Sequence, residues 1–184
     1  MNDLPDAKLM EQAAKGSEIA FAEIVRRYQD VLLNFFLRCD VSFVDGQDLA
    51  QRTFLRLWRY RKKYRAEGAK FTTFLFMLAR QESIDFFRVE TRRRMQEESL
   101  VQAAAELAPA AGAGAASASF GESVRKAMGR LTPTLREVVE LVVFQDMPYA
   151  EAGQVLGVPL GTVKSRMSNA LKRLKELLGH ECRC

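Results

Sequence analysis

The sequence predicts an all-α protein that consists of two small helical domains joined by a linker. Apolar residues recur at helical spacing on both sides of a central stretch, and no segment has the strict alternation of a half-buried strand. The central stretch is dominated by alanine, glycine and serine, so it has too few large apolar side chains to bury a core. At 184 residues the chain is long enough for two such domains.

The distribution of charge follows the same division. Residues 1–94 carry a net charge of +5, residues 95–120 of −3 and residues 121–184 of +3. Two basic blocks flank an acidic stretch, and basic blocks suit a polyanionic partner such as nucleic acid. The predicted organisation is a first domain at 1–95, a flexible acidic linker at 96–120, a second domain at 121–178 and a tail at 179–184.

Three helices are expected in the first domain. Their apolar stripes cover 21–36, 50–58 and 71–79, with a break at Asp45-Gly46 before the second of them. Basic and aromatic residues are interleaved at 54–65 and 86–94, a pattern that allows aromatic rings to stack on unpaired bases. Phe54, Leu57 and Trp58 fit the core instead, whereas Tyr60 and Tyr64 fall off the stripe and are expected to be exposed.

The second domain contains the pattern of a helix-turn-helix. Thr132 and Pro133 are expected to open a helix as its cap and first residue. A short helix at 149–156 follows, and Gly157 suits a left-handed helix end. A second helix then begins near Gly161, with an apolar stripe of Val163, Met167, Ala170, Leu171, Leu174 and Leu178. An ordinary amphipathic hairpin is the alternative, but the proline and glycine punctuation favours the helix-turn-helix.

The polar face of that second helix is the predicted DNA-binding site. A helix of this kind fits the major groove, where its first turns meet the base edges. The residues expected to bond bases are Lys164, Ser165, Ser168 and Asn169. Those expected to bind phosphates are Arg166, Lys172 and Arg173, together with the backbone N–H groups at Gly161 and Thr162.

Other classes of function find little support in the sequence. There is no nucleophile set and no glycine-rich phosphate loop, so neither an enzyme, a cofactor nor a small-molecule substrate is expected. No apolar run approaches the roughly 20 residues of a membrane helix, and the first residues lack a signal-peptide pattern. We therefore expect a cytoplasmic protein without membrane insertion. His180, Cys182 and Cys184 supply three soft ligands for a metal, with a frayed tail as the alternative interpretation.

Three stretches resemble a bacterial RNA polymerase sigma factor of the extracytoplasmic-function (ECF) type, in the sigma-70 superfamily. Residues 45–58 resemble its polymerase-binding segment and 71–88 its −10 segment. Residues 131–137, followed by 161–166, resemble its −35-binding domain. The resemblance implies a region 2 helical bundle, a region 4 helix-turn-helix and promoter-specific transcription initiation. The implied partners are promoter DNA, core RNA polymerase through the coiled coil of its largest subunit, and an anti-sigma factor.

The resemblance also implies roles for particular residues. The implied polymerase-binding residues are Asp45, Asp48, Leu49, Gln51 and Leu55. The implied −10-binding residues are Tyr60, Tyr64, Arg80, Asp85, Arg88, Arg92, Arg93 and Arg94. The sequence departs from the family pattern at Phe74, at Gln81, at Glu151-Ala152-Gly153 and at Asn169, which puts the promoter sequence in question. A stand-alone regulator with a ligand-sensing first domain is the competing hypothesis.

Overall fold

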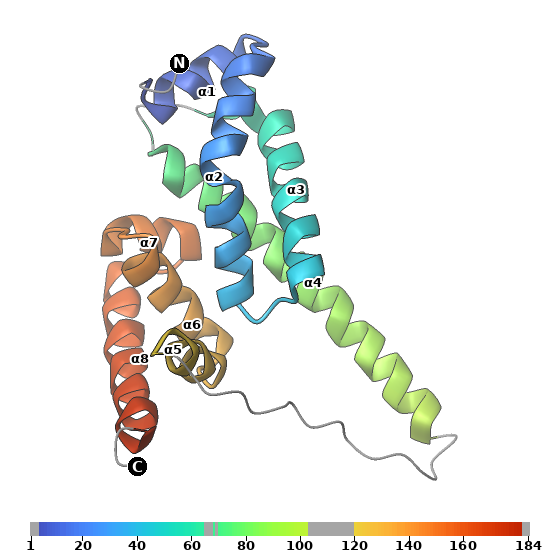
Figure 1. Ribbon diagram of the computed structural model, residues 1–184, viewed down its shortest axis with the longest axis vertical. Coiled ribbons are helices and arrows are strands. Elements are labelled where there is room, and N and C mark those ends of the chain that lie inside the picture. The colour runs from blue at the N-terminus through green and yellow to red at the C-terminus, as the bar shows by residue number, and fades with distance from the viewer. Residues whose placement is uncertain (1–3, 65–67, 69, 103–119, 182–184) are drawn as a thin grey trace.

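The computed structural model describes residues 4–64, 68, 70–102 and 120–181, and all the regular secondary structure in this part of the chain is helical (Figure 1). The elements of the N-terminal half are α1 (Asp6–Ala14), α2 (Glu18–Arg38), α3 (Phe43–Tyr60), a 3-10 turn η1 (Arg61–Lys63) and α4 (Phe71–Gln102). Those of the C-terminal half are α5 (Phe120–Gly129), α6 (Pro133–Val139), a π-helical turn η2 (Glu140–Phe144), α7 (Tyr149–Leu156) and α8 (Leu160–Glu181). The predicted all-α fold class is confirmed.

The boundary between α2 and α3 differs from the predicted one. The chain turns at Asp40, whose φ of 70° lies in the left-handed region, and Ser42 then caps α3 by accepting a hydrogen bond from the Asp45 amide. Gly46 therefore lies inside α3, and the predicted break at Asp45-Gly46 is wrong. A Cβ atom at Gly46 would lie 3.2 Å from Leu33 Cδ1, so the missing side chain allows α2 and α3 to approach closely.

The N-terminal core is formed where α1, α2, α3 and α4 meet. Phe35, Phe36 and Phe76 are among its fully buried side chains, and the Phe35 and Phe76 ring centroids are 5.3 Å apart. Burial of each such side chain contributes about 1.5–3 kcal/mol relative to exposure. This core fixes the directions of α3 and α4, the two helices that carry the candidate site residues of this half.

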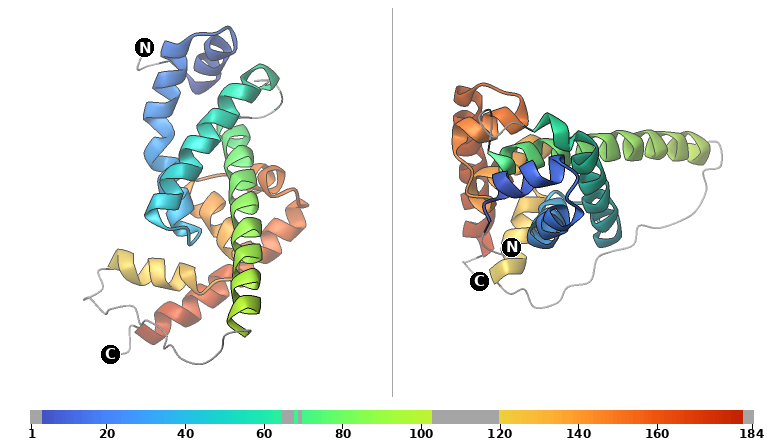
Figure 2. Two further views of the ribbon diagram at one scale, coloured as in Figure 1. Left: turned by 90° about the vertical axis from the view of Figure 1, so that its right-hand side faces the viewer. Right: turned by 90° about the horizontal axis from the view of Figure 1, so that it is seen from above.

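Helix α4 continues beyond the body of the protein. Its C-terminal half projects away from the other helices (Figure 2). The helix ends at Gln102, so residues 96–102, which the sequence assigned to a flexible linker, are helical instead. The charged residues at 88–98 keep this segment in solvent, but arginine and glutamate are also good helix formers. Composition alone did not distinguish an exposed helix from a linker, so the predicted domain boundary came too early.

In the C-terminal half, Arg136 joins α5 to α6. Its buried guanidinium donates hydrogen bonds to the carbonyl oxygens of Met128, Gly129 and Leu131 at 2.9, 2.7 and 3.3 Å. Thr132 stands at the N-cap of α6 as predicted, but its hydroxyl lies against that of Thr134 and makes no cap bond. The end of α5 and the start of α6 therefore depend on one arginine.

The two halves are in contact. Helix α7 packs against α4, and α5 packs against the end of α2 (Figure 1). None of the described helices combines the length and apolar character that a bilayer span requires.

Candidate nucleic-acid interface

The helix-turn-helix is formed by α7, a three-residue turn and α8. Helix α7 ends at Gly157, whose φ of 65° and ψ of 34° are the left-handed values predicted for a helix end. Val155 on α7 is buried together with Val163 and Met167 on α8, which fixes the two helices relative to each other. The sequence placed both helices and the turn correctly. Leu171 is an exception, because it is exposed and takes no part in the apolar stripe.

Gly153 has a structural purpose that the sequence did not reveal. Glycine inside a helix costs about 1 kcal/mol relative to alanine, and the sequence suggested only thinner packing here. A Cβ atom at this position would lie 3.0 Å from the Val158 carbonyl oxygen and 3.5 Å from Val163 Cγ2. Gly153 therefore allows the turn to approach α7, and alanine would press on a backbone carbonyl and offset its gain in helix propensity.

The predicted reading face of α8 is accessible to a ligand. Its exposed residues are Gly161, Lys164, Ser165, Ser168, Asn169, Lys172 and Arg173, and Thr162 and Arg166 are half-buried. Some of their groups already have partners. The Ser165 hydroxyl donates to the Thr162 carbonyl at 3.0 Å, and Arg173 pairs with Glu176 at 3.1 Å. The Thr162 N–H donates to the Pro159 carbonyl at 2.9 Å, so it is not the free phosphate donor that the sequence suggested.

The projecting half of α4 forms a second basic surface, the α4 ridge, defined by Arg88, Arg92, Arg93 and Arg94. All four side chains are exposed, and Arg94 pairs with Glu90 at 3.2 Å. The other residues implied on α4 lie outside the ridge. Arg80 is half-buried against Glu137, and Asp85 lies between Arg56 and Arg88 at 3.6 and 3.8 Å. Arg80 is therefore engaged within the protein and is not open to DNA in this arrangement.

The two candidate stacking tyrosines have different environments. Tyr60 is exposed, with the Lys63 ammonium 4.6 Å from its ring centroid. Tyr64 is buried, and its ring lies against those of Phe71 and Phe74 with centroids 6.1 and 5.6 Å away. The prediction that Tyr64 is exposed is wrong, because the turn η1 carries the chain back over the start of α4.

The implied polymerase-binding residues occupy one edge of α3. Asp48, Gln51 and Leu55 are exposed, Asp45 is half-buried and hydrogen-bonded to Ser42, and Leu49 is fully buried. Leu49 therefore serves the core, which contradicts a contact role for its side chain in this structure. The three exposed residues follow helical spacing and present one continuous stripe.

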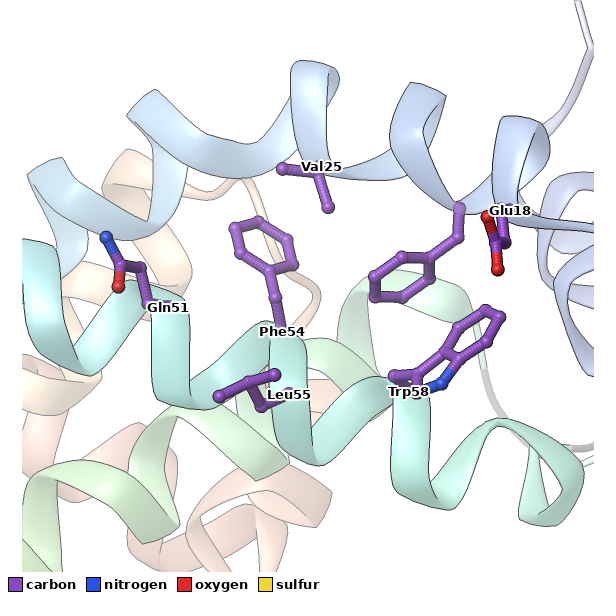
Figure 3. A pocket seen from close by; sticks show the side chains of 7 residues that line it. Glu18, Val25, Gln51, Phe54, Leu55 and Trp58 are labelled. Carbon is purple, nitrogen blue, oxygen red and sulfur yellow. The ribbon is translucent and has the colours of Figure 1, made fainter.

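Beside this stripe, α2 and α3 form an apolar groove (Figure 3). The groove has a volume of about 510 Å³, and its lining residues are Glu18, Phe21, Val25, Gln51, Phe54, Leu55 and Trp58. The sequence assigned Phe54 and Trp58 to the core, but Trp58 is half-buried, and its ring centroid lies 4.9 Å from that of Phe21. The α2–α3 groove was missed because its two walls come from different helices.

A buried carboxylate connects the α3 edge to α4. Glu82 on α4 is almost fully buried and pairs with Arg56 at 2.8 Å and with Arg52 at 3.1 Å. Arg56 also donates to the Gln81 side-chain oxygen at 2.9 Å. These contacts join α3 to α4. Gln81, which departs from the family pattern, is thus part of this network.

The candidate metal ligands contribute nothing to these surfaces. His180, Cys182 and Cys184 lie outside the described side chains, so the structure leaves that hypothesis untested. Among the side chains that are described, no group of three or more histidine, cysteine, aspartate or glutamate residues is arranged to hold a metal ion.

Comparison with known proteins identifies both halves. Residues 24–93 match the family Sigma-70 region 2, and residues 121–174 match the family Sigma-70, region 4. The chain is 28% identical over 173 residues to the ECF RNA polymerase sigma factor SigK of Mycobacterium ulcerans (strain Agy99). This similarity covers 92% of the chain and 91% of SigK.

Solved structures agree with this assignment. The sigma factor RpoE, solved with the anti-sigma factor NepR from Bartonella quintana, superposes with a TM-score of 0.66 at 26% identity, over 86% of this chain and 96% of RpoE. CnrH, solved with the cytosolic domain of CnrY, shares the fold with a TM-score of 0.71 at 24% identity, over 95% of this chain and 97% of CnrH. Since regions 2 and 4 follow each other on one chain, the protein belongs to the sigma-70 family as an ECF-type sigma factor, which directs RNA polymerase to begin transcription at specific promoters.

Proposed function

We propose that the protein grips promoter DNA with two surfaces, the exposed face of α8 on the −35 element and the α4 ridge on the −10 element. The observation that carries this proposal is the presence of two separate exposed basic helices, one in each sigma region. Helix α8 has the dimensions and the polar first turns that major-groove reading requires. The α4 ridge supplies cations for a strand backbone, and exposed Tyr60 supplies a ring for an unpaired base.

We propose that core polymerase docks on the edge of α3 and on the adjoining α2–α3 groove. Leu55 is exposed at the C-terminal end of this stripe, which continues through Gln51 to Asp48. An exposed apolar side chain flanked by polar ones is typical of a protein interface core with its rim. A coiled-coil partner presents a ridge of side chains that a groove between two helices can accept.

We also propose that the protein acts in the cytoplasm, where RNA polymerase works, and that an anti-sigma factor controls its activity. The support is the RpoE structure, which contains an anti-sigma factor and superposes on most of this chain. An anti-sigma factor that covers the α2–α3 groove would compete with polymerase for it.

Reconstituted transcription tests the proposed function. Core polymerase supplied with the purified chain is expected to start transcripts at discrete genomic positions, and polymerase alone is not. Mapping those start sites also gives the promoter sequence. Tight and specific binding of duplex DNA by the isolated chain, without any affinity for core polymerase, would instead identify a stand-alone regulator.

Two lysines on α8 separate base reading from phosphate binding. We expect Lys164→Ala to relax the preference at one −35 position by about 1–3 kcal/mol, because its side chain is exposed on the first turns of the helix. Lys172→Ala is expected to weaken binding evenly across sequences and to lower the salt slope by about one. Binding measurements on a library of −35 sequences at several salt concentrations would distinguish them. The opposite assignment would show that α8 lies in the groove in another register.

A further inference from the structure

The first helix, α1, lies across the end of the helical bundle at which α3 finishes and α4 begins (Figure 1). It packs against α2, η1 and α4, and its Leu9 and Met10 side chains are fully buried. At nine residues α1 is too short to be stable as an isolated helix in water. Its position therefore depends on its contacts with the other elements.

Asp6, in the first turn of α1, fastens this helix to α2. One oxygen of its carboxylate accepts a hydrogen bond of 2.8 Å from the Arg27 guanidinium, and the other accepts one of 2.7 Å from the Tyr28 hydroxyl. Arg27 also donates to the Leu4 carbonyl oxygen at 2.9 Å. Burial, together with the Asp6 carboxylate, raises the pKa of the Tyr28 phenol above its usual range, so the hydroxyl stays protonated and remains a donor.

The Tyr28 ring extends this contact from α2 to the start of α4. Its centroid lies 5.2 Å from that of Phe71, the first residue of α4, in an edge-to-face arrangement. Phe71 makes a second edge-to-face contact with Tyr64, which directly follows η1, and these centroids are 6.1 Å apart. Aromatic rings prefer this geometry, so each ring restricts the orientation of the next. Asp6, Tyr28, Phe71 and Tyr64 form one chain of contacts, which we call the α1 relay.

The α1 relay ends beside the ring that the proposed −10 grip uses for stacking. Tyr60 directly precedes η1 and Tyr64 directly follows it, and the Lys63 ammonium of η1 lies 4.6 Å from the Tyr60 ring centroid. At its other end η1 is tied to α3, because the Arg61 guanidinium lies 3.8 Å from the Trp58 ring centroid and donates to the Trp58 carbonyl oxygen at 2.6 Å. A displacement of Tyr64 would therefore shift Lys63 against Tyr60.

We propose that the α1 relay positions Tyr60 and η1 for the −10 strand, and that Asp6 and Tyr28 are positioning residues for promoter recognition. The inference rests on the proposed function, because it takes Tyr60 to stack on an unpaired base. Such stacking is strongest when the ring and its neighbouring cation hold their geometry before the base arrives, since preorganisation lowers the entropy cost of binding. The relay supplies this order from a helix that carries none of the proposed DNA-binding residues.

The test combines full-length variants with core polymerase on the promoter that start-site mapping identifies, and on the same promoter with its −10 element scrambled. The ratio of melted DNA on the two promoters, measured by the permanganate reactivity of unpaired thymines, reports −10 recognition. Tyr28→Phe keeps the ring against Phe71 and removes only the hydroxyl, whereas Asp6→Ala removes the acceptor. Each is expected to lower the ratio at least about fivefold, because a hydrogen bond to a charged group is lost.

Two further variants separate positioning from a loss of stability. Asp6→Asn keeps an oxygen that can accept from the Tyr28 hydroxyl, so it is expected to retain most of the wild-type ratio. Arg26→Ala is the matched control, because the Arg26 bonds to Glu23, at 2.7 and 2.8 Å, lie within α2. All four variants are expected to bind core polymerase as wild type does, measured by fluorescence anisotropy. A variant that is only destabilised would lose polymerase affinity and −10 recognition together.

Amide hydrogen exchange in the free chain adds a measurement that does not depend on DNA. Exchange at 61–64 is expected to be faster in Tyr28→Phe and in Asp6→Ala than in wild type. An unchanged ratio in these two variants, against a wild type that discriminates, overturns the proposal, and so does a loss that Arg26→Ala or Asp6→Asn shares in full. A wild type that melts both promoters equally contradicts the proposed function instead, and faster exchange at 61–64 then still supports the relay as the anchor of η1.

Discussion

Replacing Leu55 by aspartate is expected to weaken binding to core polymerase by at least about thirtyfold, the ratio that corresponds to a hot-spot loss of about 2 kcal/mol. Leu55 is 58% exposed on the α3 edge and lines the α2–α3 groove. A carboxylate there removes apolar contact area and adds a charge that docking would desolvate. The affinity of the purified chain for core polymerase, measured by fluorescence anisotropy without DNA, checks this.

The control for this variant is Leu171→Asp. Leu171 is a leucine of similar exposure, 52%, but it lies on α8 in the other half of the molecule. Both substitutions are expected to change the free energy of unfolding by less than about 1 kcal/mol, because neither side chain is buried. Equal losses of polymerase affinity in the two variants, or none in Leu55→Asp, would remove the α3 edge from the docking surface.

Replacing Arg136 by methionine is expected to destabilise the C-terminal half by about 3–5 kcal/mol. The buried guanidinium is a hydrogen-bond partner of three carbonyl oxygens at the end of α5 and the start of α6. Methionine fills part of the volume but removes this donor from all three carbonyl oxygens. The Met128 oxygen keeps the Leu131 N–H as a partner, and each buried acceptor that is left without a partner costs about 1–3 kcal/mol.

The single tryptophan makes this prediction measurable for each half separately. Trp58 lies on α3, so its fluorescence follows unfolding of the N-terminal half, whereas far-ultraviolet circular dichroism follows all helices. In Arg136→Met the dichroism signal is expected to gain an early transition that Trp58 does not report. Arg130→Met, at an exposed position just after α5, is expected to leave both transitions in place. A shared, unshifted transition in Arg136→Met would mean that Arg136 does not hold α5 and α6 together.

Local sequence patterns were sufficient for most of the helices. Pro148, Gly157 and Pro159 delimit α7 and the start of α8, because proline fixes φ at its own position and glycine readily adopts the left-handed φ of a helix end. The apolar period identified α2, α3 and α6, since a helix must turn one face to the core. The same reasoning predicted the exposed face of α8, because the residues opposite a buried apolar stripe must face solvent.

The errors occurred where a distant segment decides the environment of a residue. Tyr64 falls off the apolar stripe of α3, but it follows η1, which turns it into contact with Phe71 and Phe74. Leu49 lies among the implied polymerase-binding residues, yet it points into the core of the helical bundle. Gly46 looks like a helix breaker in sequence and is instead a point of close helix contact.

The sequence by itself determined the helical fold, the two basic halves, the helix-turn-helix and the membership of the sigma-70 family, because each depends on the order and type of neighbouring residues. Only the tertiary structure decided which cations remain available for DNA. Arg38 and Glu140 form an ion pair although they are 102 positions apart, and no periodicity connects them. Their pairing depends on how the two halves meet, since ion pairing is a property of distance in space and not of spacing along the chain.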